Sequence, residues 1–120
     1  MGFCWTTLQV SDLDRAIAFY RDVAGLPVAR RFGGGGHFIA FLGDGETKVE
    51  LIADAGRTPP GRGEGATLGF RVASLDAQLA LCAEKGVAVE RGPMSPGPGI
   101  RFFYVRDPDG FEVQFVEESR

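Results

Sequence analysis

The sequence predicts an α+β fold in which one βαβββ unit occurs twice. Two segments have the pattern of a hairpin, because an acidic, glycine-containing turn separates two apolar runs: HFIAFLGDGETKVELIA from His37 and IRFFYVRDPDGFEVQFVE from Ile100. Each hairpin is preceded by a strand and a helical pattern, TLQVSDLDRAIAFYRDVAGL in the first half and LGFRVASLDAQLALCAEKGV in the second. Aligning Leu13 with Leu75 brings the two halves into register, which indicates an internal repeat.

Length and composition fit one compact domain. The 120 residues are 44% hydrophobic and 24% charged, as expected of a chain with its own core. We predict a single domain over residues 1–120, with repeat one at about 3–53, a connector at 54–65 and repeat two at about 66–117. The connector, DAGRTPPGRGEG, is rich in Pro, Gly and charge and shows no periodicity.

Charge and hydrophobicity argue against two classes of partner. The net charge is −3, and the 13 basic residues are scattered among 16 acidic ones, so we expect no nucleic-acid and no membrane partner. The apolar runs are strand-sized and the N-terminus has no signal-peptide pattern, which predicts a soluble, cytoplasmic protein. Cys4 and Cys82 are therefore expected to stay reduced.

The first copy begins with an alternating strand over residues 3–10. A helix follows, with Ser11 as its expected N-cap and Gly25 as its end. Its apolar stripe is Leu13, Ala16, Ile17, Tyr20 and Ala24. The second strand runs from about Pro27 to Phe32 and leads into Gly33–Gly36, four glycines that we expect to form a flexible loop.

The second copy repeats this order. Leu68, Phe70 and Val72 alternate in a strand, and Ser74 opens a helix. The apolar stripe of that helix is Leu75, Leu79, Cys82 and Ala83, which makes Cys82 a core residue rather than a reactive one. The segment Gly92–Gly99 falls where the glycine run of the first copy falls. Such loops often line binding sites, although both segments also fit the role of plain hairpin connections.

The paired βαβββ pattern, with VSDLDRAIAFYRDVAGL near its start and DPDGFEVQFVE near its end, resembles the vicinal oxygen chelate superfamily. This superfamily includes glyoxalase I, bleomycin resistance proteins and ring-cleaving dioxygenases. The resemblance covers the chain from Phe3 to Glu117. It implies a half-open, eight-stranded mixed barrel with the helices on the outside, a ligand on its concave side and a homodimer; the reaction is not implied, because one scaffold hosts many chemistries.

The resemblance also implies four metal-ligand positions, which commonly hold two His and two Glu. Matched residue by residue, they are Trp5 and Glu50 in the first copy and Thr67 and Gln114 in the second. A catalytic transition metal usually takes about three protein ligands among imidazole, carboxylate and thiolate groups. Of this quartet only Glu50 supplies one, since an indole N–H is a donor only and hydroxyl and amide oxygens are weak ligands. We therefore expect a degenerate metal site and no cofactor.

Two further potential ligands lie outside the quartet. His37, the only histidine, matches none of the four positions, so it would join a metal site only if that site were rearranged; we expect a rim histidine. Cys4 is next to Trp5 but is expected on the opposite strand face, towards the helix.

Alternation from the matched positions predicts which side chains face the concave side. The expected ligand-binding residues are Trp5, Thr7, Gln9, Glu50, Thr67, Arg71 and Gln114, with Ile52, Gly69, Glu112 and Val116 on the same faces. An indole beside several polar groups suits a flat, partly polar organic molecule. Phe102, Phe103 and Tyr104 are divided by alternation between core and cavity.

Glu50 has two open interpretations. It is flanked by Val49 and Leu51 and is expected to face a partly apolar pocket, which would suit it to acid–base catalysis. It is equally consistent with a structural ion pair to Arg71 or another cation. The leading hypothesis is a metal-independent protein of the bleomycin-resistance type that binds an aromatic or polar organic compound. The alternative is a glyoxalase I-like lyase or isomerase that uses Glu50, with or without a metal, and a third is a regulatory module with a vestigial pocket.

Overall fold

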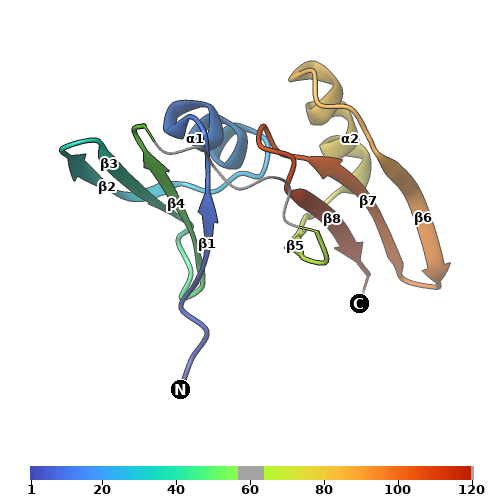
Figure 1. The fold of residues 1–120 in the computed structure, drawn as a ribbon. Helices are drawn as coiled ribbons and strands as arrows, with labels where there is room; N and C mark the ends of the chain where they lie inside the picture. Colours follow the sequence, from blue (N-terminus) through green and yellow to red (C-terminus); the bar gives the residue numbers. More distant parts are fainter. Residues whose placement is uncertain (57–63, 120) are drawn as a thin grey trace. The chain divides into compact units, whose positions relative to one another are not determined.

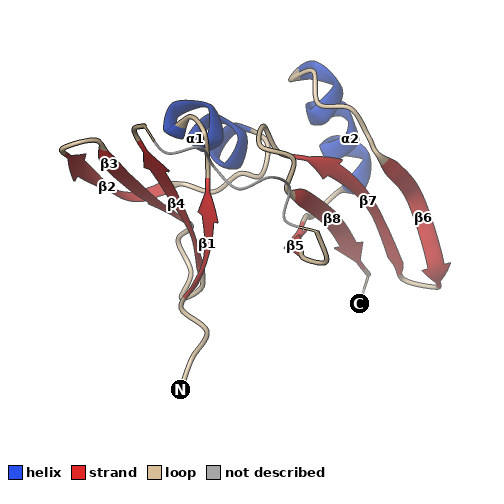
Figure 2. Cartoon of the chain, in the orientation of Figure 1, coloured by secondary structure: helices blue, strands red, loops and turns tan. Residues whose placement is uncertain are grey.

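The computed structural model describes residues 1–56 and 64–119, which belong to two compact units, Met1–Gly61 and Arg62–Arg120 (Figure 1). Each unit has the order β–α–β–β–β, as Figure 2 shows by element type. The α+β class and the repeated βαβββ unit are therefore confirmed, while closure into a half-open barrel stays a prediction. Of the predicted connector, Asp54 ends a strand and residues 57–63 lie outside the described residues.

The first unit is a four-stranded sheet in the order β1-β4-β3-β2. Its elements are β1 (Trp5–Gln9), α1 (Leu13–Asp22), β2 (Val28–Gly34), β3 (His37–Leu42) and β4 (Lys48–Asp54). β1 pairs in parallel with β4, and the other pairs are antiparallel. Alternate side chains of the strands form a core with the apolar stripe of α1: Leu8, Ala40, Leu42, Val49, Leu51, Leu13, Ala16, Ile17 and Tyr20 are all buried.

The second unit repeats this arrangement with the order β5-β8-β7-β6. Its elements are β5 (Thr67–Arg71), α2 (Leu75–Glu84), β6 (Arg91–Gly97), β7 (Ile100–Arg106) and β8 (Glu112–Glu118). Its buried residues include Leu75, Cys82, Phe103, Val105, Val113 and Phe115. Phe103 thus faces the core, whereas Phe102 and Tyr104 lie on the other face. Cys82 is confirmed as a core residue, and burial raises the pKa of its thiol.

The two helices begin at different kinds of cap. Ser74 caps α2 as predicted, because its Oγ accepts the N–H of Ala77 at 3.1 Å. The prediction of Ser11 for α1 is wrong: Asp12 has the extended N-cap backbone, and its carboxylate accepts the N–H of Arg15 at 3.1 Å. Neither described helix is long and apolar enough to cross a membrane.

The two expected glycine loops are largely strand. β2 continues through Gly34, and Gly35 and Gly36 form the turn to β3 with φ of 63° and 85°. Two successive positive φ angles are what a tight hairpin turn requires. At Gly33, with φ of 152°, a Cβ would lie 2.4 Å from the backbone oxygen of His37 on β3. The predicted loop Gly92–Gly99 is also mostly strand β6. Pairing with β3 and β7 overrides the weak strand propensity of these segments.

A buried carboxylate holds the predicted DPDG turn between β7 and β8. Asp107 is 5% exposed, and its Oδ1 accepts the N–H groups of Asp109 and Phe111, each at 2.9 Å. The backbone N–H of Asp107 also donates to the carbonyl of Phe111 at 2.9 Å. The turn is therefore fixed by side-chain as well as backbone hydrogen bonds.

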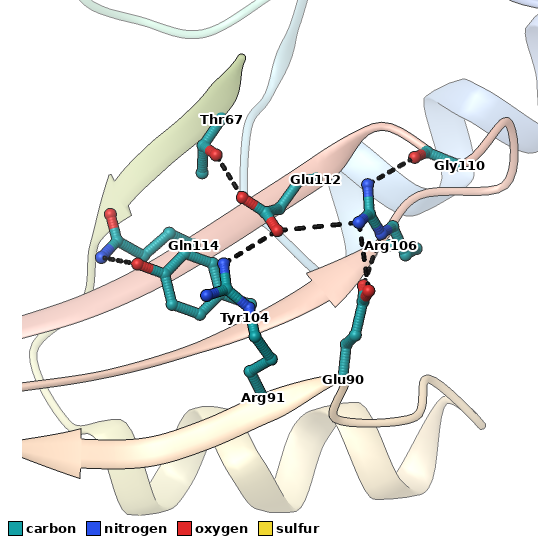
Figure 3. A network of polar contacts seen from close by, with 8 residues as sticks. All are labelled: Thr67, Glu90, Arg91, Tyr104, Arg106, Gly110, Glu112 and Gln114. Atoms are coloured by element: carbon teal, nitrogen blue, oxygen red, sulfur yellow. Dashed lines mark hydrogen bonds and ion pairs between the residues drawn. The ribbon is translucent and has the colours of Figure 1, made fainter. Parts of the chain in front are cut away.

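A charge network covers the face of the second sheet opposite α2. Figure 3 shows the Glu112 carboxylate of β8 accepting a hydrogen bond from Thr67 of β5 and pairing with Arg91 of β6 at 2.9 Å. Arg106 of β7 lies 3.7 Å from Glu112 and also pairs with Glu90. The Thr67 hydrogen bond and the two arginines lower the pKa of Glu112 against the opposing effect of burial. One carboxylate thus links four strands.

Replacing Asp107 tests the DPDG turn. Asp107→Ala leaves two part-buried N–H groups without their acceptor and should lower the free energy of unfolding by about 1–3 kcal/mol. Asp107→Asn keeps an oxygen acceptor and should cost less. Urea denaturation measures both. Asp44→Ala removes an exposed carboxylate from the turn between β3 and β4 and serves as the control; an equal loss there would contradict this account.

Replacing Glu112 tests the charge network. Glu112→Gln should lower the free energy of unfolding by about 1–2 kcal/mol at neutral pH, where the carboxylate is ionised. Because folding lowers the pKa of Glu112 from its ordinary value of 4.5, this contribution is present above that value and is lost as the pH falls through the lowered pKa. Denaturant titrations at a series of pH values measure the difference. Glu84→Gln, on the exposed end of α2, is the control; a pH-independent loss for Glu112→Gln would rule the network out as its cause.

Candidate functional site

The face of the first sheet opposite α1 carries the predicted site residues of the first copy. Parallel pairing places Thr7 beside Glu50 and Gln9 beside Ile52. The hydroxyl of Thr7 donates to Glu50 Oε1 at 2.5 Å, and the Glu50 side chain is half-buried. These residues therefore share one face with Trp5, as alternation along the two strands requires.

Trp5 belongs to an aromatic cluster that it forms with Phe32 and Phe41. The indole meets the Phe41 ring edge-on, with centroids 5.3 Å apart at 73°, and Phe32 stacks with Phe41 at 6.3 Å and 21°. Trp5 and Phe32 are 49% and 48% exposed, whereas Phe41 is 5% exposed. The aromatic cluster thus has a buried centre and an open surface of the kind that binds flat rings.

Arg30 lies against this aromatic cluster. Its guanidinium carbon is 4.9 Å from the Phe41 centroid and 5.7 Å from the Phe32 centroid. In the strand registers Arg30 opposes Phe41, and Phe41 opposes Glu50. A cation, an aromatic ring and a carboxylate therefore form one row across β2, β3 and β4.

The sequence interpretation missed Arg30, Phe32 and Phe41. Their signal was the alternation of the β2–β3 hairpin, which becomes readable only once Gly35 and Gly36 are known to form its turn.

The predicted site residues of the second copy are bound to neighbours in their own sheet. Gln114 Nε2 donates to the Tyr104 hydroxyl at 3.2 Å, and Thr67 donates to Glu112 (Figure 3). Arg71 pairs with Glu118 at 3.1 Å. An ion pair between Arg71 and Glu50, which belong to different units, stays a prediction. Ligand contacts by Thr67, Arg71 and Gln114 stay a prediction.

The sequence interpretation also missed the arginines of this second face. Arg91 lies over the Tyr104 ring, with its guanidinium carbon 3.9 Å from the centroid, and both Arg91 and Arg106 pair with Glu112. Arg91 begins β6, and its face depends on pairing with β7, which the loop predicted over Gly92–Gly99 does not include. Arg106 lies at the end of the predicted strand from Ile100, where its signal was alternation with Phe102 and Tyr104.

The strand registers support the internal equivalence of the four matched positions. Thr7, two residues after Trp5, opposes Glu50, and Gly69, two residues after Thr67, opposes Gln114. Glu50 and Gln114 therefore occupy corresponding places in the two units.

These four residues do not fit the divalent metal that the resemblance implies. Trp5 packs on Phe41, Gln114 donates to Tyr104, and the quartet contains a single carboxylate. Within residues 1–56 and 64–119, no group of three His, Cys, Asp or Glu side chains is arranged to hold a metal ion.

The remaining candidates lie outside the four matched positions. His37 begins β3, and its Nδ1 is in short contact with Asp54 Oδ1. Cys4 is exposed and precedes β1, and the expectation that it faces the helix stays a prediction. A hollow of about 410 Å³ at the start of α1 is lined by Arg31 and Phe38, among others, and by none of the predicted site residues.

Comparisons with known proteins agree with this architecture. The sequence profile of the Glyoxalase/Bleomycin resistance protein/Dioxygenase superfamily matches residues 2–115. A lactoylglutathione lyase from Haemophilus influenzae is 35% identical over 128 residues, which cover 99% of this chain and 94% of that relative.

Solved structures show the same likeness. Glyoxalase I from Leishmania major matches with a TM-score of 0.84 and 26% identity, over 98% of this chain and 87% of that one. An antibiotic-binding protein from a Streptomyces species matches with a TM-score of 0.78 and 28% identity, over 99% and 97% of the two chains. With its repeated βαβββ units and a match over nearly its whole length, this chain belongs to the Glyoxalase/Bleomycin resistance protein/Dioxygenase superfamily.

Proposed function

We propose that the protein binds a planar, partly polar organic molecule on the face of the first sheet opposite α1, without a metal ion. The observation that carries this proposal is the aromatic cluster. Trp5 stands at a position where metal-dependent relatives are expected to have a ligand, and its half-exposed indole joins Phe32 and Phe41 in one surface. The surface suits stacking and offers no coordination.

The exposed area of the two rings indicates that stacking alone would bind a small ligand weakly, so polar groups must contribute to its binding. Covering the exposed half of Trp5 and Phe32 would remove roughly 100 Å² per ring from water, or about 5 kcal/mol in total at about 25 cal/mol per Å². The loss of translational and rotational freedom on association costs about 4 kcal/mol or more, which offsets most of this favourable free energy. The bonded pair of Thr7 and Glu50, with Gln9 on the same face, supplies the polar contacts that would orient the molecule.

One of the structural comparisons supports ligand binding as the function. One structural match is described as an antibiotic-binding protein, and it spans nearly all of this chain at 28% identity. We therefore propose sequestration or carriage of an organic compound rather than its conversion.

Replacing Trp5 tests the binding proposal. Azobenzene-4-carboxamide is a flat, neutral probe whose absorbance allows equilibrium dialysis. We expect the wild-type protein to bind it equally well with and without EDTA, because no metal takes part. Trp5→Ala should weaken binding about tenfold or more, since it removes the largest exposed ring of the aromatic cluster.

Phe38→Ala is the matched control. Phe38 is an exposed aromatic residue of β3 on the opposite face of the same sheet, and it lines the hollow near α1. Binding should persist in this variant. Loss of binding on EDTA treatment, or an equal loss in Phe38→Ala, would contradict the proposed site.

A second candidate function is a glyoxalase-type lyase. Two observations favour it: the 35% identical relative is named lactoylglutathione lyase, and Glu50 keeps a carboxylate at one of the four matched positions. In such an enzyme Glu50 would move a proton at the substrate while Thr7, bonded to its Oε1, orients it.

Glu50 separates the two candidates. The ultraviolet absorbance of the thioester measures lactoylglutathione formation. We expect none above background, whether the protein is treated with EDTA or supplemented with Ni²⁺ or Zn²⁺, because the four matched positions contain too few metal ligands. Turnover that appears with metal and falls about 100-fold or more in Glu50→Gln would establish the lyase instead. Elemental analysis of the purified protein gives the accompanying metal content.

A further inference from the structure

We propose that the ligand of this face is a planar aromatic monoanion whose negative group is bound by Arg30. The inference rests on the proposed binding function and narrows it to a chemical class. Three features support it: the position of Arg30 on the aromatic cluster, its lack of a carboxylate partner among the described residues, and the negative charge of Glu50 at the other end of the same row of side chains.

The position of Arg30 is set by the rings beneath it. Its guanidinium carbon lies within 5.7 Å of the centroids of both Phe41 and Phe32. A guanidinium has five N–H donors, and a carboxylate or phenolate can accept those that have no partner in the protein. A flat ligand on the aromatic cluster would therefore meet a cation at its edge.

Arg30 differs from most other arginines in the described residues. Six of these pair with a carboxylate: Arg21, Arg31, Arg71, Arg91, Arg101 and Arg106. Within residues 1–56 and 64–119, Arg30 makes no such pair, and neither does Arg15, which lies on α1. Arg30 is thus the cation in contact with the aromatic cluster that has no carboxylate partner among the described residues. Lys48 lies on the same face beside Trp5, but its ammonium donates to the backbone carbonyl of Gly45.

The opposite end of the row limits the ligand to one negative charge. Arg30 and Glu50 flank Phe41 on neighbouring strands, so their Cα atoms are about 10 Å apart, or two strand spacings. The Glu50 carboxylate would repel a second anionic group and would accept a hydrogen bond from a hydroxyl or amine. A ligand lying across Phe41 would therefore place its anion towards β2 and a neutral or donor edge towards β4.

Two probes of the same shape test this selectivity. Azobenzene-4-carboxylate and azobenzene-4-carboxamide share a flat skeleton and differ in charge, and both absorb where tryptophan emits. Trp5 is the only tryptophan, so quenching of its fluorescence reports binding at this face. We expect the carboxylate to bind about tenfold more tightly at neutral pH and low salt, the effect of one charge-assisted contact, and the preference to fall as salt is added.

Arg30→Gln should reduce this preference to about twofold or less, because it removes the charge and keeps a polar side chain. Arg31→Gln is the matched control: it removes the same charge one residue along β2, from a side chain that pairs with Asp14 of α1 at 2.7 Å. The preference should survive there. Urea denaturation of both variants confirms that they fold.

The outcomes separate this inference from the function on which it rests. Equal affinity of the wild-type protein for the two probes, or an equal loss of preference in Arg31→Gln, would overturn the role of Arg30 and leave the binding function standing. Failure of both probes to quench Trp5 would remove the binding function and this inference with it.

Discussion

The packing of one helix against one face of each four-stranded sheet is the constraint on which the other features depend. Because strand side chains alternate, commitment of Leu51 and Val49 to the side of α1 leaves Glu50 on the other side, and the same holds for Val113, Phe115 and Gln114 in the second unit. The apolar positions thus determine the fold, and the intervening residues, on the face opposite the helix, are not needed to form the core. Family members can change chemistry there at little cost to stability.

The faces opposite the helices differ between the two units in how their charged groups are paired. In the second unit, Glu112 pairs with Arg91 and Glu90 pairs with Arg106, so the charged groups of that face satisfy one another. In the first unit, the aromatic cluster is half-open and its neighbouring cation has no carboxylate partner among the described residues. A face that is internally satisfied contributes to stability, whereas one with exposed rings and an unneutralised charge has free energy to gain from a ligand.

Periodicity was sufficient to predict the parts of this protein that depend on local pattern. It placed Trp5, Thr7 and Glu50 on one face and Cys82 in the core, because burial follows strand and helix periods directly. It failed where pairing between strands decides the structure. The glycine run and the Gly92–Gly99 segment have weak strand propensity of their own, so local pattern predicts loops where the structure has β6 and the end of β2. Without the pairing of β2 with β3 and of β6 with β7, the faces of Arg30 and Arg91 could not be assigned.

The close approach at Gly33 links backbone geometry to ligand chemistry. Any side chain at this position would collide with the β3 backbone and push the edge strand β2 outwards, carrying Arg30 away from the rings beneath it. Trp5 and Phe41 lie on other strands and would be left in place. A relative with a bulky residue here would therefore keep the hydrophobic platform but lose its electrostatic selectivity. One glycine, without touching any ligand, would act as a determinant of ligand charge.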